Sequence, residues 1–218
     1  FPHRIKIGDT SIEVGEQNPR WYRRRDLVKL RTGLARADLL VCDSQATLIA
    51  CQKHFPNVNS VCVPLGLDVK SFAPVDQEKI EVLAPASQLV KKCHLLIVGS
   101  HAPRKRLQFL SQLLGELDEE VKQNIRVHHV GNDTCPYGGP SASELAQKYD
   151  LKNWTTYGGE LSSAALMHLR HASEALLFPS ASEGFGYPPL EAMACGTPVL
   201  CSNLPSHNEL MPEESCLR

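Results

Sequence analysis

The sequence lacks the long apolar runs and the excess of one charge that would place it in a membrane or on a nucleic acid. Apolar runs such as Leu39–Cys42 and Leu95–Val98 are far shorter than the roughly 20 residues that span a bilayer. The formal net charge is -1 over 218 residues, which provides no general attraction to a polyanion. We therefore expect neither a membrane-spanning segment nor a nucleic-acid partner.

The eight cysteines form no pattern typical of a metal site or of a disulfide framework. They are scattered, and no C-x-x-C pair occurs. Free thiols in a reducing compartment are therefore expected, which favours a cytoplasmic location and argues against a zinc site. No D-x-D motif stands at a predicted strand end either. We expect no metal among the cofactors and no metal-ligating residue.

What the chain does have is the composition and element order of an α/β protein. Hydrophobic residues make up 42% and charged residues 22% of the sequence, which is close to globular averages. From about residue 76 onward, apolar runs alternate with helical segments, which predicts a parallel sheet covered on both faces. The predicted strands of this part are His94–Val98, Ile125–Val130, Trp154–Tyr157, Ala175–Phe178 and Thr197–Cys201. Before it, we predict helices over Trp21–Arg36 and Gln45–Phe55 and strands over Asp38–Asp43 and Val58–Val63.

The segment Phe178–Leu200 combines a strand end, a glycine turn and the start of a helix. The turn Gly184-Phe185-Gly186 precedes Tyr187 and a proline pair that suits the first turn of a helix. Such a turn presents unpaired backbone N–H groups and the positive end of a helix dipole, which together favour a phosphate. We expect Gly184, Phe185, Gly186 and Tyr187 to contact a diphosphate through their backbone.

Two carboxylates, Glu183 and Glu191, stand in the same segment with seven residues between them. Glu183 falls in the turn, where its carboxylate can accept hydrogen bonds from sugar hydroxyls. Glu191 falls about one turn into the helix, where a carboxylate can bridge a ribose diol. The arrangement suits a nucleotide-diphosphate sugar. The alternative is an ordinary strand–turn–helix with both glutamates solvated, which a lone Gly-x-Gly would favour.

The full string that begins at Ser180 is Ser-x-x-Glu-Gly-Phe-Gly-x-Pro-x-Leu-Glu-Ala-Met-Ala-x-Gly-Thr-Pro-Val. It resembles the E-x7-E signature of the family-4 retaining glycosyltransferases, which have the GT-B fold. The resemblance implies a Rossmann-like parallel sheet of a GT-B C-terminal domain, plus the last part of the N-terminal domain. It also implies that Glu183 acts at the sugar and that Glu191 binds the ribose.

A second segment, Gly99–Leu107, resembles the part of that family where a lysine after Pro-Arg binds the donor diphosphate. The resemblance assigns this catalytic role to Lys105, with Arg104 beside it, and places Gly99 and Ser100 in the donor site. Fixed cations near a departing diphosphate stabilise its developing charge. Ser100 stands where some relatives carry an arginine, so one phosphate contact is expected to be absent. A solvated basic helix start is the alternative for the cations.

A third segment, Trp154–Ser162, resembles the strand and loop that lie near the nucleotide base in relatives. Tyr157 and Glu160 are therefore candidates for the base site. Core packing is an equal alternative for Tyr157, because base recognition at this loop is often through backbone atoms.

The resemblance also predicts the domain organisation. Residues 1–75 are expected to be part of an acceptor-side N-terminal domain with its linker. Residues 76–218 are expected to be the nucleotide-sugar-binding C-terminal domain, truncated relative to the family. The catalytic histidine of many relatives would fall near Ile5–Thr10, where this chain has Gly8 and Asp9. We carry no catalytic histidine over, and Asp9 is either a polar contact to the sugar or a turn residue.

The helix predicted near residues 20–36 is rich in arginine and lysine, with Leu27, Leu30 and Leu34 as an apolar stripe. We interpret it chiefly as a solvated basic face over a core stripe. The alternative is contact with an anionic membrane surface, which would make a cytoplasmic protein peripheral at the inner membrane face.

The residues and the resemblance together predict a retaining, metal-independent glycosyltransferase. It would transfer a hexose-type sugar from a nucleotide-diphosphate sugar to a hydroxyl of a glycan, lipid-linked or small-molecule acceptor. One alternative is a catalytically incomplete nucleotide-sugar-binding or scaffold subunit that needs a partner chain. Another is a nucleotide-sugar epimerase of GT-B shape. The sequence names neither the sugar nor the base.

Overall fold

The computed structural model describes residues 3–7, 10–14, 20–72, 93–135, 138–158 and 161–211. The chain divides into two compact units. Unit 1 contains Phe1–Gly66, Ala181–Gly186 and Asn203–Arg218, and unit 2 contains Leu67–Ser180 and Tyr187–Ser202. The backbone therefore passes between the units four times, and each unit is described by itself.

Unit 1 is built from two strand pairs and three helices within the described residues. Its elements are β1 (His3–Ile7), β2 (Thr10–Val14), α1 (Trp21–Ala35), β3 (Leu40–Cys42), α2 (Gln45–His54), β4 (Ser60–Cys62) and α9 (Pro205–Asn208). β1 and β2 pair antiparallel, and β3 and β4 pair parallel with α2 as the crossover. A parallel pair needs such a crossover, because the chain must return to the same end of the sheet.

The first turn of α2 is capped from two directions. The Ser44 side chain accepts a hydrogen bond from the Thr47 backbone N–H at 3.0 Å. The Glu209 carboxylate, from the residue after α9, accepts the backbone N–H groups of Gln45 and Ala46, each at 2.7 Å. The first N–H groups of a helix have no partner inside the helix, and a carboxylate also stabilises the positive dipole end. Residues more than 160 positions apart are thereby joined at one helix end.

The helix α1 forms where the sequence predicts it, but its environment differs from the prediction. No side chain of α1 is buried among the described residues, and Leu30 is 55% exposed. Trp21 is 73% exposed, and the Arg25 guanidinium lies 5.8 Å from its ring centroid. Leu27 and Leu34 are half-buried and Leu30 is exposed, so the three leucines do not form the expected core stripe in the described structure. No helix in the described ranges has both the length and the apolar character needed to cross a bilayer.

Unit 2 contains a five-stranded parallel sheet in the order β7-β6-β5-β8-β9. Its strands are β5 (Cys93–Val98), β6 (Ile125–Val130), β7 (Trp154–Tyr157), β8 (Ala175–Phe178) and β9 (Val199–Cys201). Its helical elements are η1 (Val69–Phe72), η3 (Pro103–Lys105), α4 (Leu107–Gly115), α5 (Glu119–Asn124), α6 (Ala142–Lys148), α7 (Ser163–Ala172) and α8 (Tyr187–Ala194). From the central strand β5 the chain builds outward through β6 and β7, and then builds the other half through β8 and β9.

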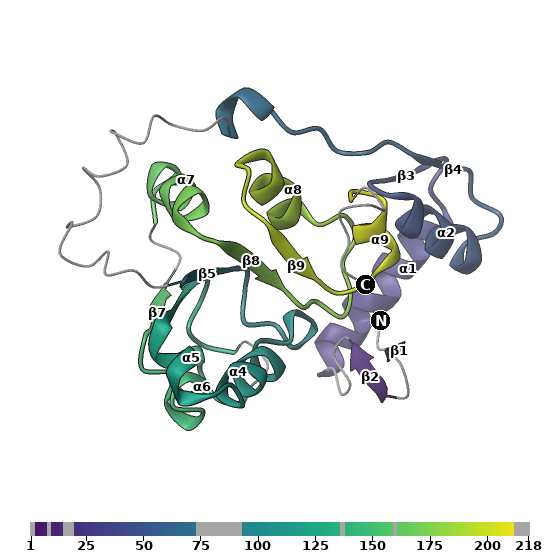
Figure 1. The fold of residues 1–218 in the computed structure, drawn as a ribbon. Coiled ribbons are helices and arrows are strands. Elements are labelled where there is room, and N and C mark those ends of the chain that lie inside the picture. Colours follow the sequence, from purple (N-terminus) through teal and green to yellow (C-terminus); the bar gives the residue numbers. More distant parts are fainter. Residues whose placement is uncertain are drawn as a thin grey trace. The chain divides into compact units, whose positions relative to one another are not determined.

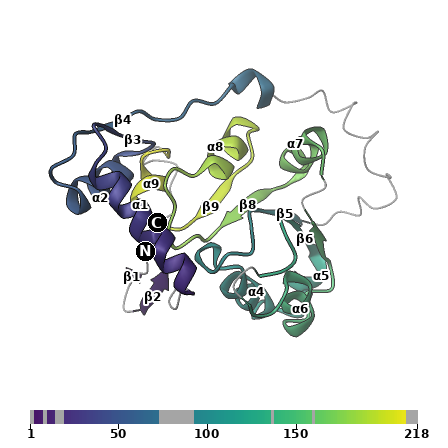
Figure 2. The same ribbon diagram turned by 180° about the vertical axis from the view of Figure 1, so that it is seen from behind.

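Helices cover both faces of this sheet, as its apolar strands require. Figures 1 and 2 show α4 and α6 on one face and α7 and α8 on the other. The alternation of strand side chains produces two cores. Ile97, Val127 and Leu177 pack with Leu110 and Leu145 on the α4 and α6 face. On the opposite face the core includes Leu96, Leu176, Phe178, Ala192 and the half-buried Leu166 and Leu169.

The predicted strands and helices of this part are present, with ends that differ by a few residues. Ser162 caps α7, since its side chain accepts from the Ala165 N–H at 3.2 Å. The seven cysteines in the described ranges are free, which confirms the expected thiols for that part of the chain. The β1–β2 pair and the short helices α5, α6 and α9 were not predicted.

Candidate functional site

The order of strands creates a switch point between β5 and β8. These neighbouring parallel strands belong to halves of the sheet that are built in opposite directions, with Leu95 opposite Ala175 and Leu96 opposite Leu176. Connections leave such a point toward opposite faces, so a crevice forms beyond the carboxyl ends of the strands, and ligands of open α/β sheets bind there. The loop after β5 begins at Gly99 and carries the predicted cations.

Lys105 lies directly at this sheet edge. Its Nζ atom lies 4.3 Å from the ring centroid of Phe178, the last residue of β8. Its aliphatic stem passes Gly99, where an added β-carbon would lie 3.3 Å from Lys105 Cε. Gly99 also has φ +148°, a conformation that side chains disfavour, so the backbone here favours glycine.

The residues around Lys105 include four of the predicted positions. A narrow cavity of about 10 Å³ is lined by Gly99, Ser100 and Lys105 together with Phe178, Pro179 and Ser180. Arg104 is half-buried in the same turn, η3. Helix α4 starts only at Leu107, so both cations precede the helix rather than occupying its first turn. The structure thus brings Gly99, Ser100, Arg104 and Lys105 together at the switch point.

Gly131 supports this loop, a role that the sequence did not reveal. The Gly99 N–H donates to Val130 O at 3.0 Å, and the Gly131 N–H donates to Tyr157 O at 3.0 Å. A β-carbon on Gly131 would lie 1.9 Å from the Gly99 carbonyl oxygen, so only glycine fits. The glycine that ends the predicted strand was the available signal, but nothing in the sequence named the backbone that it meets.

The signature turn Ala181–Gly186 belongs to unit 1, where it is held by residues far away in sequence. The Ser44 hydroxyl donates to Gly184 O at 2.6 Å. An added β-carbon on Gly184 would lie 3.0 Å from Oδ2 of Asp43. On the other side, Gly186 has φ +109° and packs on the fully buried His207. The turn containing Glu183 is therefore a fixed structure, set between two parts of unit 1.

The remaining turn residues have different environments. Phe185 is buried, with 7% of its surface exposed, so its side chain packs and only its backbone is offered to a ligand. Tyr187 is partly exposed and begins α8, as the proline pair predicts. Glu183 lies in unit 1, whereas Lys105 and Glu191 lie in unit 2.

Glu191 lies in α8 as predicted, but it has a partner that the sequence did not reveal. Its carboxylate forms an ion pair with Arg170 of α7. Burial raises the pKa of Glu191, and the Arg170 guanidinium opposes that rise. Arg170 is itself 5% exposed, which marks a buried charge pair rather than a solvated glutamate. The solvated alternative for Glu191 is therefore wrong for this structure.

Tyr157 is part of a chain of side chains across three strands. The Tyr157 hydroxyl lies 3.2 Å from Nδ1 of His128, and Nε2 of His128 lies 2.9 Å from Nδ1 of His94. Burial, followed by the neighbouring His94 and Arg126, lowers the pKa of His128 to about 4. Tyr157 is thus half-buried in a polar network of the sheet, and its role at a base stays a prediction. Glu160 lies outside the described residues, as does Asp9.

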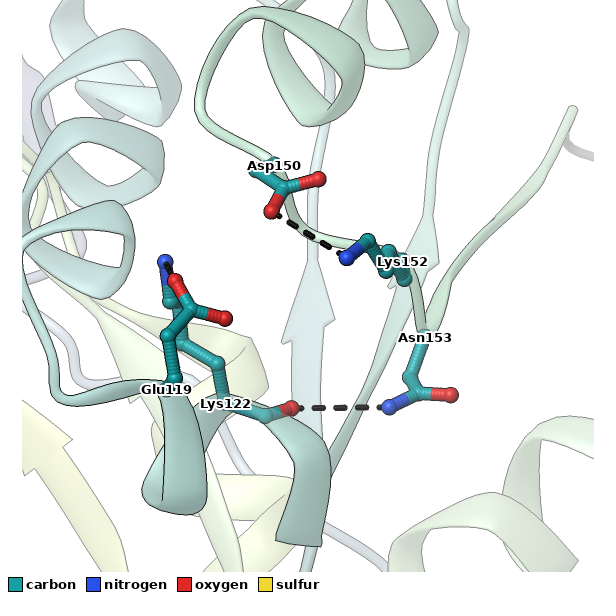
Figure 3. Close-up of polar contacts among 5 residues, drawn as sticks. All are labelled: Glu119, Lys122, Asp150, Lys152 and Asn153. Atoms are coloured by element: carbon teal, nitrogen blue, oxygen red, sulfur yellow. Dashed lines mark hydrogen bonds and ion pairs between the residues drawn. The ribbon is translucent and has the colours of Figure 1, made fainter.

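A separate polar cleft is formed by α5 and the turn before β7 (Figure 3). Lys122 pairs with Glu119, and Lys152 lies 3.4 Å from Asp150. The Asn153 side chain donates to the Lys122 carbonyl oxygen at 3.4 Å. Each ion pair lies within one element, and the Asn153 hydrogen bond joins the two elements, so the cleft presents no cluster of one sign. Over the described ranges, no group of three histidine, cysteine or acidic side chains is arranged to hold a metal ion.

The model of the family Glycosyl transferases group 1 matches residues 81–215, which include both the Lys105 loop and the E-x7-E segment. The chain belongs to this family. The O-antigen chain mannosyltransferase B of Escherichia coli is 32% identical over 124 residues, which are 57% of this chain and 32% of that protein. The O-antigen chain mannosyltransferase RfbU of Salmonella typhimurium is 39% identical over 144 residues, 63% of this chain and 39% of that protein. This chain therefore spans between about a third and two fifths of the length of these curated relatives.

Comparison with solved structures shows the fold of this chain. Sucrose-phosphate synthase from Thermosynechococcus elongatus superposes with a TM-score of 0.67 at 24% identity. The superposition covers 85% of this chain and 46% of that one. The parallel sheet and its covering helices are those of a GT-B glycosyltransferase, which confirms the predicted fold class.

Proposed function

We propose that this protein is a retaining glycosyltransferase that moves a hexose-type sugar, without a metal ion, from a nucleotide-diphosphate sugar to an acceptor hydroxyl. Family membership supports glycosyl transfer. The observation that carries the choice of donor is the Lys105 ammonium at the switch point, 4.3 Å from the Phe178 ring and beside the Gly99 turn. A fixed cation at a strand end suits a diphosphate.

The proposed reaction exchanges one bond at the anomeric carbon for another. The bond from this carbon to the β-phosphate oxygen breaks, and the acceptor oxygen forms its bond on the same face, which retains the configuration. The proton of the acceptor hydroxyl passes to the departing diphosphate. Lys105 and Arg104 stabilise the negative charge that develops there, and the backbone of Phe185–Tyr187 adds N–H donors. Glu183 holds the sugar hydroxyls.

The other donor contacts are proposed on the same basis. Glu191 accepts hydrogen bonds from the ribose diol, and the turns at Gly99–Ser100 and Gly184–Gly186 bind the phosphates. Tyr157 and Glu160 are proposed near the base. The two curated relatives are both named as mannosyltransferases of an O-antigen chain, so mannose is the sugar we propose to test first, with a glycan as acceptor.

A membrane-surface contact is proposed for α1. The helix has no fully buried side chain in the described structure and presents Arg23, Arg24, Arg25 and Lys29 beside the exposed Trp21. Cations attract anionic headgroups, and tryptophan favours the interface. The contact would bring the transferase to a lipid-linked acceptor.

The test is whether UDP, GDP, ADP or their sugars bind to the wild-type chain. Binding is measured as the gain in stability against thermal unfolding and as the dissociation constant from calorimetry. A nucleotide at a hundred times its dissociation constant should stabilise the chain by about 2.7 kcal/mol. We expect one base to be selected, with EDTA having no effect. Lys105→Gln should weaken diphosphate binding by roughly 10–100-fold, since a hydrogen bond to a charged group is lost.

Lys152→Gln is the matched control, because this lysine lies in the polar cleft and pairs only with Asp150 among the described side chains. It should leave nucleotide affinity unchanged. A folded wild-type chain that binds none of the nucleotides would contradict the proposal and favour a scaffold subunit.

A further inference from the structure

We propose that Arg170 is a positioning residue that holds the Glu191 carboxylate ionised and aimed at the ribose of the donor nucleotide. The inference rests on the proposed function, and it explains how a half-buried glutamate can serve as a ribose ligand. Arg170 lies outside the three segments that carry the family resemblance.

The contact between the two side chains occupies one carboxylate oxygen. Nη2 of Arg170 donates to Oε2 of Glu191, and both residues lie in unit 2. The Glu191 side chain retains 22% of its exposure, whereas that of Arg170 retains 6%. No described residue donates to Oε1 of Glu191. One oxygen is therefore fixed by the arginine, and the other is available to a hydroxyl pair.

Arg170 is held in place at both ends of the residue. Its backbone carbonyl accepts the Thr197 hydroxyl at 2.7 Å in a buried hydrogen bond. Its guanidinium carbon lies 5.5 Å from the Phe72 ring centroid. Because the arginine is anchored, the carboxylate that it binds takes one orientation, and α7 and α8 are joined at the level of Glu191.

Burial and the charge of Arg170 act on the pKa of Glu191 in opposite directions. Burial favours the neutral acid and raises the pKa of Glu191, and the guanidinium is the group that counters this. The other titratable group facing the pair is the Cys195 thiol, whose pKa is raised chiefly by burial, so it stays neutral. A ribose diol needs acceptor oxygens, and a protonated carboxyl has lost part of that capacity. Arginine suits this role because it keeps its charge when buried.

The experiment compares the preferred nucleoside diphosphate with its 2′,3′-dideoxy analogue by calorimetry. For the wild type we expect at least about tenfold weaker binding of the analogue, with a ratio that is constant between about pH 6.5 and pH 8.5. In Arg170→Met the pKa of Glu191 rises further, so the ratio should fall below about threefold at the acid end and recover toward pH 8.5. Arg170→Lys should keep most of the ratio, and Arg31→Met, on the exposed face of α1, should leave it unchanged.

The outcomes separate the two proposals. Equal loss of affinity for both ligands in Arg170→Met, or an unchanged ratio at every pH, would overturn the positioning role while the donor site stands. If Arg170→Met does not fold, the wild type alone decides: a ratio that falls toward one below about pH 7 would show that the arginine does not keep the carboxylate ionised. A wild type that binds no nucleotide at all would overturn the proposed function as well.

Discussion

At the scale of single residues, glycine marks the places where two backbone segments of this chain meet. Gly131 ends β6 against the Gly99 carbonyl, with 1.9 Å left for a β-carbon. The loop that presents Lys105 therefore depends on a residue outside the loop. A change at Gly131 should alter both the fold of unit 2 and the position of Gly99.

We expect Gly131→Ala to destabilise unit 2 by about 2 kcal/mol or more, since backbone must shift to admit the methyl group. Urea unfolding measures the loss, and nucleotide affinity should fall with it. Gly158→Ala is the matched control, because a β-carbon there meets no atom within 4 Å. If both variants are equally stable, the close approach at Gly131 is not a constraint.

The proximity of predicted site residues could be predicted from the sequence where they lie in one continuous segment. Gly99, Arg104 and Lys105 share a turn, and their proximity follows from the strand that precedes them. The partners of the site were not recoverable. Arg170 meets Glu191 only because α7 and α8 pack on the same face of the sheet, a relation that no spacing in the sequence encodes.

At the scale of elements, the first turn of α2 is capped by the Glu209 carboxylate, which comes from a distant part of the sequence of unit 1. Glu209 accepts the backbone N–H groups of Gln45 and Ala46 at 2.7 Å each. The Ser44 side chain accepts only the N–H of Thr47, so the two caps satisfy different donors of the first turn. Charge-assisted hydrogen bonds of this kind are stronger than neutral ones. The helix end and the segment after α9 should therefore unfold together.

Glu209→Gln should lower the stability of unit 1 by roughly 1–3 kcal/mol, because the neutral amide offers one acceptor where two N–H groups need satisfaction. Thermal unfolding measures this change, and hydrogen exchange at Gln45 and Ala46 locates it. Glu120→Gln, in the first turn of α5, is the control and should change stability little. Equal effects of the two substitutions would contradict the capping role.

A strand or helix could be predicted from the sequence where its apolar residues form a clear run or a periodic pattern. β8 is four buried residues in a row, and a run of that kind between turn residues indicates a strand. α5 is short, polar and without buried residues, so its sequence carries no periodic signal. α1 shows the opposite error: a leucine stripe predicts a core face, but burial depends on what covers the helix.

At the scale of the whole molecule, the chain buries histidines that do not accept a proton readily. Burial is the first cause that lowers the pKa values of His128 and His129, in each case to about 4. In the unfolded chain these two histidines have the ordinary pKa of 6.5. Between pH 6.5 and pH 4 the unfolded chain therefore binds more protons than the folded chain. The free energy of unfolding should therefore decrease as the pH falls through this window.

The expected slope is about 1 kcal/mol per pH unit for each histidine once the pH is well below 6.5. Urea unfolding between about pH 7.5 and pH 4.5 measures it. His128→Phe should remove the contribution of one histidine from this slope. His54→Gln, at an exposed position, should leave the slope unchanged. An unaltered slope in His128→Phe would show that this histidine is not the group that titrates.

The division into units was the part of the molecule least visible in the sequence. The prediction divided the chain once, near residue 75, whereas the two units exchange the backbone four times. Ala181–Gly186 lies in the middle of a strand–turn–helix by sequence, yet it is bound by Ser44. Local patterns identify strands and helices, but which of them share a unit depends on contacts over more than a hundred residues.

The Glu209 cap has a consequence for the order in which the newly made protein folds. Synthesis proceeds from the amino end, and domains generally fold as units during it. Ser44 and Gln45 are made before their partners Gly184 and Glu209, which leave the ribosome more than a hundred residues later. By then β5 to β7, with α4 and α6, have all been made. The contacts that hold Ser44 and the start of α2 are therefore completed only after those strands and helices have been made, although Ser44 and Gln45 precede them in the chain.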